Sequence, residues 1–282
     1  MDTFGKPNFQ YIRPELCETA WSLIHPNAML EAQGITKYYT SIPALEDVSF
    51  HAVPGEVLGY LGPNGSGKST TVNILTGLLE PSRGKVLFEG YPIRDHLIEY
   101  KRRLGYVPEE PHIYPYLSGY EYLELVGRLR EMPEATLKDK IEGLLALMAL
   151  SPHRHSPISS YSKGMKQKVL IAAALLHNPD VLIFDEPLSG LDITSALVFR
   201  HLLTALARQG KTILYSSHVL EVVEKICQRV VILHKGRMVA HDSVTELRHL
   251  LSLPSLEEIF SQIVVQEDTA KTADSIVEVM SL

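Results

Sequence analysis

The amino-acid sequence predicts an α/β fold in which helices cover both faces of a parallel β-sheet. Short, continuously apolar segments such as "EVLGYLG" and "DVLIFDEP" are typical of strands buried on both faces. These segments alternate along the chain with longer segments of helical periodicity. A chain of 282 residues is long enough for one large α/β domain or two small ones.

The first half of the chain favours strands. Residues 1–27 contain three prolines and no clear period, so we expect an irregular N-terminal extension there. From residue 28, "MLEAQGITKYYT" and "LEDVSFHAV" alternate like half-buried strands, and "EVLGYLG" follows as a buried strand. A helix is expected to begin near Gly67, with two further strands at "KVLFEG" and "RLGYVPE".

The second half begins with a helical stretch. Ser118 and Glu121 have the spacing of a capping box, which predicts a helix that ends near Arg130. "EATLKDKIEGLLALMAL" predicts a second helix, and "MKQKVLIAAALLH" predicts another after the punctuation near Pro157. The strands "DVLIFDEP", "TILYSSH" and "RVVILHKG" follow, and the polar, acidic end of the chain predicts a loosely held tail.

Composition and charge narrow the classes of function. The net charge of −6 gives no support for a nucleic-acid partner, although a local basic patch stays open. Cys17 and Cys227 lie far apart and suggest neither a disulfide framework nor a metal cluster. No apolar run approaches the ~18 residues of a membrane span, and no signal peptide is recognised. We therefore expect a cytosolic chain whose membrane role, if it has one, comes through a partner.

The segment "GPNGSGKST" at residues 62–70 fits the phosphate-binding pattern G-x-x-x-x-G-K-[ST]. Glycines let successive backbone N–H groups point at an anion, and the helix that follows adds the positive end of its dipole. Lys68 supplies a cation to the outer phosphates, and the Ser69 hydroxyl can take a position on Mg²⁺. The alternative is a glycine-rich turn with an exposed lysine. The predicted loop comprises Gly62, Pro63, Asn64, Gly65, Ser66, Gly67, Lys68, Ser69 and Thr70.

Two acids and a histidine complete the predicted chemistry. Asp185 and Glu186 end the strand "VLIF", where a parallel strand points toward the ligand cleft. We expect Asp185 to hold Mg²⁺ and Glu186 to polarise the attacking water as general base. His218 directly follows "TILYSS" and can reach the γ-phosphate. The alternatives are an acidic turn at a strand end and a structural histidine.

From about Ala28 to Phe260 these residues resemble the nucleotide-binding subunit of an ATP-binding cassette (ABC) transporter. "GPNGSGKST" resembles its Walker A motif, "VLIFDEP" its Walker B motif with the catalytic glutamate, and "YSKGMKQK" its signature motif. "SGLD" at 189–192 resembles the D-loop and "SSH" the switch histidine. "KYY" resembles the loop that stacks on adenine, with Tyr39 as the better-aligned ring. The motifs occur in the family's order.

The resemblance implies a P-loop NTPase core with a parallel sheet, an antiparallel β subdomain and an α-helical subdomain at about 109–165. It places the ATPase domain at 28–264 and leaves 265–282 as a C-terminal tail. It implies ATP and Mg²⁺ as ligands. It also implies head-to-tail pairing with a second such subunit, an identical one in the simplest case, so that each ATP lies between the phosphate loop of one chain and the signature motif of the other. Ser162 and Gly164 match the phosphate-touching positions of that motif, and Asp192 would help to join the two sites.

The sequence departs from the family pattern at two places. Lys163 and Met165 replace the commoner Gly and Gln of the signature motif. In "GYVPEEP", Glu109 stands where the family usually has Gln. A carboxylate there can still bind Mg²⁺ or water, but it adds negative charge beside the triphosphate. The alternative is a solvated loop acid.

The predicted partner is a membrane permease. Tyrosines are concentrated at Tyr106, Tyr114, Tyr116, Tyr120 and Tyr122. Since tyrosine suits surfaces that are wet before binding and apolar afterwards, we expect segment 106–123 to receive a short permease helix; ordinary helix packing is the alternative.

"SLEEIF" at 255–260 resembles the C-terminal motif of the type-2 exporter branch. The chain is therefore predicted to hydrolyse ATP for export, at the cytoplasmic face of the membrane, bound through the permease. The rivals are an ABC-superfamily ATPase that acts on DNA or ribosomes, a nucleotide-binding regulator without catalysis, and a P-loop kinase or GTPase.

Overall fold

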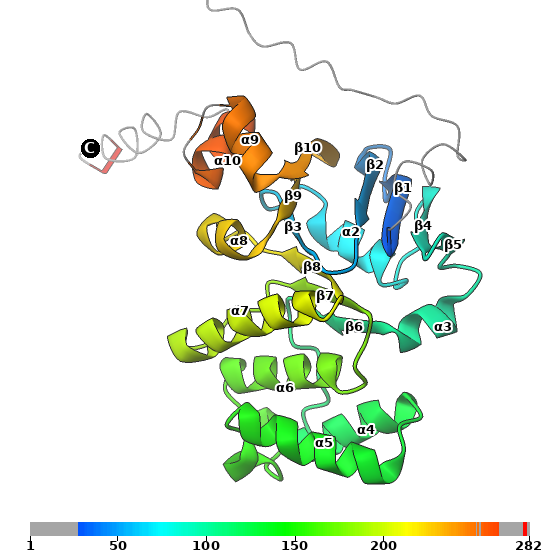
Figure 1. Cartoon of the computed structure of the whole chain (residues 1–282), viewed down its shortest axis with the longest axis vertical. Helices are drawn as coiled ribbons and strands as arrows, with labels where there is room; N and C mark the ends of the chain where they lie inside the picture. Colours follow the sequence, from blue (N-terminus) through cyan, green and yellow to red (C-terminus); the bar gives the residue numbers. More distant parts are fainter. Residues whose placement is uncertain (1–27, 252, 254, 265–278, 281–282) are drawn as a thin grey trace, which may run out of the picture.

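The computed structural model describes residues 28–251, 253, 255–264 and 279–280 (Figure 1). The predicted N-terminal extension lies outside these residues, as does the predicted tail except for 279–280. None of the helices in the described part is both long and apolar enough to cross a membrane.

A six-stranded sheet forms the centre of the molecule, in the order β10-β9-β3-β8-β7-β6. Strands β9, β3, β8, β7 and β6 are parallel, which confirms the predicted sheet. β10 pairs with β9 in an antiparallel hairpin that no pattern in the sequence had predicted. The strands are β3 Val57–Leu61, β6 Leu104–Val107, β7 Val181–Asp185, β8 Thr212–Ser216, β9 Arg229–His234 and β10 Arg237–Ser243.

A separate antiparallel sheet has the order β2-β1-β4-β5. It confirms the antiparallel β subdomain that the family resemblance implied. Phe50 of this sheet and Tyr60 of β3 lie in one buried cluster, with ring centroids 5.2 Å apart, so the two sheets share a core. The strands are β1 Leu30–Tyr38, β2 Pro43–Ala52, β4 Arg83–Phe88 and β5 Tyr91–Pro92.

Side chains of β7 alternate between two cores, as expected for a sheet covered on both faces. Val181 and Ile183 pack with α2 and the antiparallel sheet, while Leu182 and Phe184 pack with α6 (Lys163–Leu175), α7 and α8. Besides α4, α5 and α6, the α-helices of the described residues are α2 Lys68–Leu75, α3 Leu97–Arg102, α7 Ile193–Arg208, α8 Leu220–Ile226, α9 Val244–Leu251 and α10 Leu256–Val264. Helix α3 and strand β5 had not been predicted.

Helices α4 Gly119–Leu129, α5 Glu134–Leu147 and α6 Lys163–Leu175 share a third apolar cluster. α4 and α5 lie at the end of the molecule away from α9 and α10 (Figure 1). The predicted capping box is present, because Glu121 N donates to Ser118 Oγ (3.2 Å) and Ser118 N donates to a Glu121 carboxylate oxygen (2.8 Å). α6 begins two residues earlier than the predicted segment, because the Ser162 hydroxyl caps it by accepting from Met165 N.

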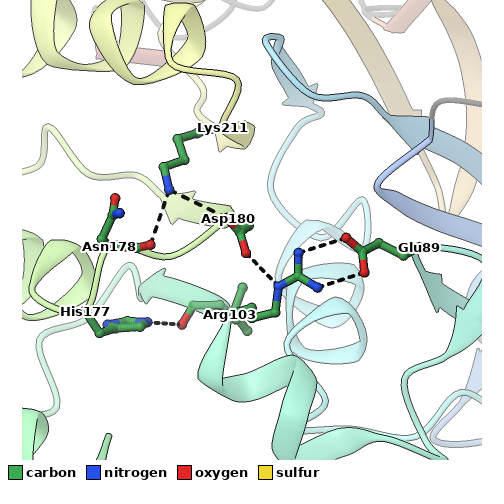
Figure 2. A network of polar contacts seen from close by, with 7 residues as sticks. Glu89, Arg103, His177, Asn178, Asp180 and Lys211 are labelled. Carbon is green, nitrogen blue, oxygen red and sulfur yellow. Dashed lines mark hydrogen bonds and ion pairs between the residues drawn. The ribbon is translucent and has the colours of Figure 1, made fainter. Parts of the chain in front are cut away.

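A polar network ties the two sheets together where β6 and β7 begin (Figure 2). Arg103 donates two hydrogen bonds to Glu89, at 2.7 and 2.8 Å, and one through Nε to Asp180 at 2.6 Å. Its guanidinium also lies over the Phe88 ring, 4.6 Å from the centroid. Lys211 reaches Asp180 from the α7–β8 turn. One arginine therefore joins the β4–β5 turn to the edge of the central sheet.

Candidate functional site

The loop at residues 62–67 joins the fully buried strand β3 to α2, which begins at Lys68. Gly67 adopts a φ of 105°, in the left-handed region that favours glycine. A Cβ at this position would also lie 2.5 Å from Leu45 Cδ2. The backbone at this turn therefore requires glycine, as the phosphate-binding pattern predicts.

Lys68 lies across the opening of this loop. Its Nζ donates to the carbonyl oxygens of Gly62 (2.6 Å) and Pro63 (3.1 Å). Burial lowers the pKa of the ammonium, while Glu186, Asp185 and Glu109 oppose that change by their charge. The lysine thus faces three acids across the same space.

That space is a cavity of about 400 Å³. It unites the loop with the end of β6, the end of β7, the β8–α8 turn and helix α10. Its lining residues are Gly62, Pro63, Asn64, Gly65, Lys68, Ser69, Glu109, Asp185, Glu186, Ser217, His218, Leu220 and Phe260.

The two acids after "VLIF" have different surroundings. The Asp185 side chain closes β7 and is buried, and burial raises its pKa to about 6, with Glu109 and Glu186 adding to the increase. Glu186 has a φ of 46°, which is rare for a residue with a side chain, and its N–H donates to Ser216 O. This left-handed turn follows directly on the strand and directs Glu186 toward the β8–α8 turn.

The Glu186 carboxylate accepts three hydrogen bonds from that turn. Oε1 accepts from the backbone N–H of His218 (2.8 Å) and from His218 Nδ1 (2.6 Å), since a carboxylate can only accept. Oε2 accepts from the Ser217 hydroxyl at 3.2 Å. The same hydroxyl oxygen accepts from Val219 N, so Ser217 links the acid to the start of the following segment.

The signature and D-loop residues lie apart from the lining of the cavity. Ser162 is exposed, and Gly164 packs so closely on the D-loop that a Cβ there would overlap the Gly190 carbonyl oxygen. Asp192 caps α7 by accepting from the N–H and the hydroxyl of Ser195, and these bonds lower its pKa to about 2. The signature and D-loop segments are therefore in close contact at Gly164 and Gly190.

The structure thus brings together part of the predicted site. Ten predicted residues line the cavity: Gly62, Pro63, Asn64, Gly65, Lys68, Ser69, Glu109, Asp185, Glu186 and His218. The lining does not include Ser66, Gly67 and Thr70 of the loop, nor Tyr39, Ser162, Gly164 and Asp192. Tyr39 lies 61% exposed beyond β1, with Lys37 Nζ 5.7 Å from its ring centroid.

Three lining residues had not been predicted as part of the site: Ser217, Leu220 and Phe260. Ser217 directly precedes the predicted histidine, His218, and this position next to it in the sequence could have indicated that Ser217 belongs to the site. Phe260 belongs to "SLEEIF" and lies about forty residues after Ser217 in the sequence. No local pattern in the sequence connects this segment to a phosphate site.

The donor set fits Mg²⁺. The Ser69 hydroxyl and the carboxylates of Asp185 and Glu109 are oxygen donors in the lining of the same cavity. Across the described residues, no cluster of three or more His, Cys, Asp or Glu side chains forms a complete metal site. Mg²⁺ commonly uses one or two protein carboxylates and completes its shell with phosphates and water.

A glycine-bounded loop between a buried parallel strand and a helix, faced by a strand-end carboxylate, defines a P-loop nucleoside triphosphatase. Residues 45–189 match the ABC transporter family. The chain belongs to this family: it is an ATP-binding, ATP-hydrolysing subunit of an ABC transporter.

Related proteins share most of the chain. An ABC transporter ATP-binding protein of Nostoc sp. is 42% identical over 208 residues, which cover 73% of this chain and 62% of the relative. The ABC transporter ATP-binding protein NatA of Bacillus subtilis is 37% identical over 226 residues, 80% of this chain and 92% of NatA. The linearmycin resistance ATP-binding protein LnrL of Bacillus subtilis is 35% identical over 219 residues, 78% of this chain and 70% of LnrL.

Two solved structures share the fold. The ATP-binding subunit of an ABC transporter superposes with a TM-score of 0.79 at 35% identity, covering 83% of this chain and 99% of that one. The dimeric structure of the cassette MJ0796 in a post-hydrolysis state, bound to ADP and Pi, gives a TM-score of 0.71 at 27% identity, with coverage of 76% and 98%.

Proposed function

We propose that this chain hydrolyses ATP as one half of a head-to-tail pair of cassettes that drives a separate membrane permease. The main support for this proposal is that one cavity is lined by Lys68, Ser69, Asp185, Glu186 and His218. Ser162 is exposed and lies outside that lining, so a second chain must bring its own signature segment to complete each site. The dimeric cassette among the solved relatives supports this pairing.

The roles follow from the chemistry of each side chain. Lys68 and the loop N–H groups bind the outer phosphates, and Tyr39 stacks on adenine. Ser69 and Asp185 hold Mg²⁺, with Glu109 as a further oxygen donor; the ion neutralises charge on the phosphates when it is bound. Glu186 accepts a proton from the attacking water, and His218 fixes the orientation of its carboxylate.

Two exposed tyrosines are the proposed contact with the permease. Tyr114 is 63% exposed and Tyr116 is 90% exposed. Their loop is held from below, because Ser159 N donates to Pro115 O and Ile158 N donates to Leu117 O, both at 2.8 Å. These bonds hold the loop next to the residues that precede the signature motif. A movement of the two tyrosines would therefore also move the signature segment, which contacts the partner cassette in the proposed pair.

Further parts of the proposal rest on the relatives and the sequence. The name of LnrL, a resistance protein, and the "SLEEIF" segment support export and the type-2 branch. We place the ATPase domain at 28–264, with its helical subdomain at about 109–165. Through the permease the chain would lie at the cytoplasmic face of the membrane.

Phosphate release from the purified chain tests the proposal. Lys68→Ala and Glu186→Gln should each reduce the Mg²⁺-dependent rate by about 100-fold or more, because each removes a charge from the reacting groups. Lys138→Ala, an exposed lysine on α5, should leave the rate unchanged. Wild-type rates in both site variants would show that this cavity is not where ATP is hydrolysed.

A further inference from the structure

The C-terminal segment "SLEEIF" has a physical explanation in the structure. The Ser255 hydroxyl accepts from Glu258 N at 3.2 Å and so starts helix α10. Glu257 and Glu258 lie in the first turn, where negative charge favours the helix dipole. Leu256 is fully buried in the main core. The residues of this segment therefore start helix α10 and anchor it to the core.

Phe260 lies one turn beyond Leu256 and on the same side of α10. It is partly buried, packs against the same core cluster, and lines the nucleotide cavity. Leu220 does the same from the start of α8. The two side chains add apolar surface to a cavity that is otherwise lined mostly by polar residues, and Leu220 lies two positions after His218 in the chain.

Helix α10 is fastened to the element that follows the switch histidine. Leu256 N donates to Glu224 Oε2 at 3.3 Å, and Glu224 Oε1 pairs with Arg248 Nη1 at 3.2 Å. Glu224 belongs to α8, which begins at Leu220, two residues after His218. The β8–α8 turn is thus held at one end by the central sheet and at the other by a helix that α9 and α10 secure.

We propose that Phe260 is a positioning residue for hydrolysis, which keeps the Ser217–Val219 turn in place so that His218 and Ser217 hold the Glu186 carboxylate. This rests on the proposed function, in which Glu186 is the base. Glu186 has three hydrogen bonds to that turn, so a shift of the turn rotates the carboxylate.

The proposal separates two parts of the reaction. Phe260 belongs to α10, which packs against α8, the helix that begins two residues after His218, whereas the phosphate loop would bind nucleotide through its own N–H groups and Lys68. Loss of the ring should therefore slow the chemical step and leave the affinity for ADP as it was. A residue that only filled the core would change stability without separating kcat from ADP binding.

Steady-state hydrolysis and ADP titration of Phe260→Ala, Phe260→Leu and Glu257→Ala test this. We expect kcat of Phe260→Ala to fall by about tenfold, as small misplacements of catalytic groups do, with the dissociation constant for ADP within about twofold of wild type. Phe260→Leu, which keeps an apolar side chain and the fold, should recover most of kcat. Glu257→Ala, exposed on the same helix, should behave as wild type.

The outcomes distinguish this inference from the proposed function. An unchanged kcat in Phe260→Ala, or an equal loss of kcat and ADP affinity in both Phe260 variants, overturns the role of Phe260. Glu186→Gln serves as the reference: if it hydrolyses ATP at the wild-type rate, the proposed base is wrong, whatever the Phe260 variants do.

Discussion

Asp185 shows at the scale of one residue how a site opposes the stability of its own fold. Asp185 is 4% exposed, and its carboxyl group is close enough to Glu109 and Glu186 to be affected by their charge. Its pKa rises from 3.8 to about 6. Between these values the folded chain holds the proton more tightly than the unfolded chain does, so the free energy of unfolding falls as pH rises from about 4 to 6. At neutral pH the full penalty is present.

Asp185→Asn should therefore stabilise the protein while it stops the reaction. Removing a buried charge should raise the free energy of unfolding at pH 7 by on the order of 2 kcal/mol, and the gain should vanish near pH 4. Mg²⁺-dependent hydrolysis should be lost, because the amide is a poor ligand for this cation. Urea denaturation at pH 4 and pH 7 measures the first effect. A variant less stable than wild type at pH 7 would contradict it.

A loop motif is local, so the sequence alone could predict the phosphate loop, and six of its nine predicted residues line the cavity. It could not predict the bonds that Glu186 makes. Its contact with His218 depends on a left-handed turn at 186 and on the adjacency of β7 and β8. Neither is encoded in the spacing of the two residues, which are 32 positions apart in the chain.

At the scale of elements, the Arg103 network joins the two sheets by side chains that are only partly exposed. Arg103→Ala should lower the free energy of unfolding by about 1 to 2 kcal/mol, because it removes a bidentate pair and a third charged hydrogen bond. Arg102→Ala is the matched control: its single pair with Glu131 is well exposed, so its effect should be small. Urea denaturation midpoints compare the two, and equal midpoints would mean that the network adds nothing to stability.

Elements with a clear signal in the sequence were predictable, and elements without one were not. The capping box before α4 has a fixed spacing, and the continuously apolar runs of β3, β7 and β8 indicate buried strands. β5 has two residues, and α3 has six with Tyr100 as its only buried one, so neither displays a pattern. β10 is antiparallel because a tight turn at Lys235 and Gly236 returns the chain beside β9; the alternation of strand and helix upstream predicts only parallel additions.

At the scale of the whole molecule, the proposed head-to-tail pairing predicts that two inactive variants can help each other. Lys68→Ala removes the phosphate lysine of one surface, and Ser162→Arg blocks the exposed signature segment of the other. Each alone should be inactive. An equal mixture should recover about a quarter of wild-type phosphate release, since half of the pairs are mixed and each has one intact site.

Mixing the variants at several ratios supplies the check. Recovery should be greatest at equal amounts and should fall with dilution. If both variants pair but no ratio restores activity, each site is built within one chain and the head-to-tail proposal is wrong. The family resemblance, rather than the fold of the single chain, suggested this arrangement.

The contact between Gly164 and Gly190 has a consequence for such a pair. Because a backbone carbonyl fills the space that any side chain at 164 would need, the turn at Ser162 and the turn at Asp192 cannot shift independently. A neighbouring chain that contacts one of these two turns is therefore also correctly positioned relative to the other turn. Nucleotide binding at one site can therefore affect the neighbouring chain through this single backbone contact between Gly164 and Gly190.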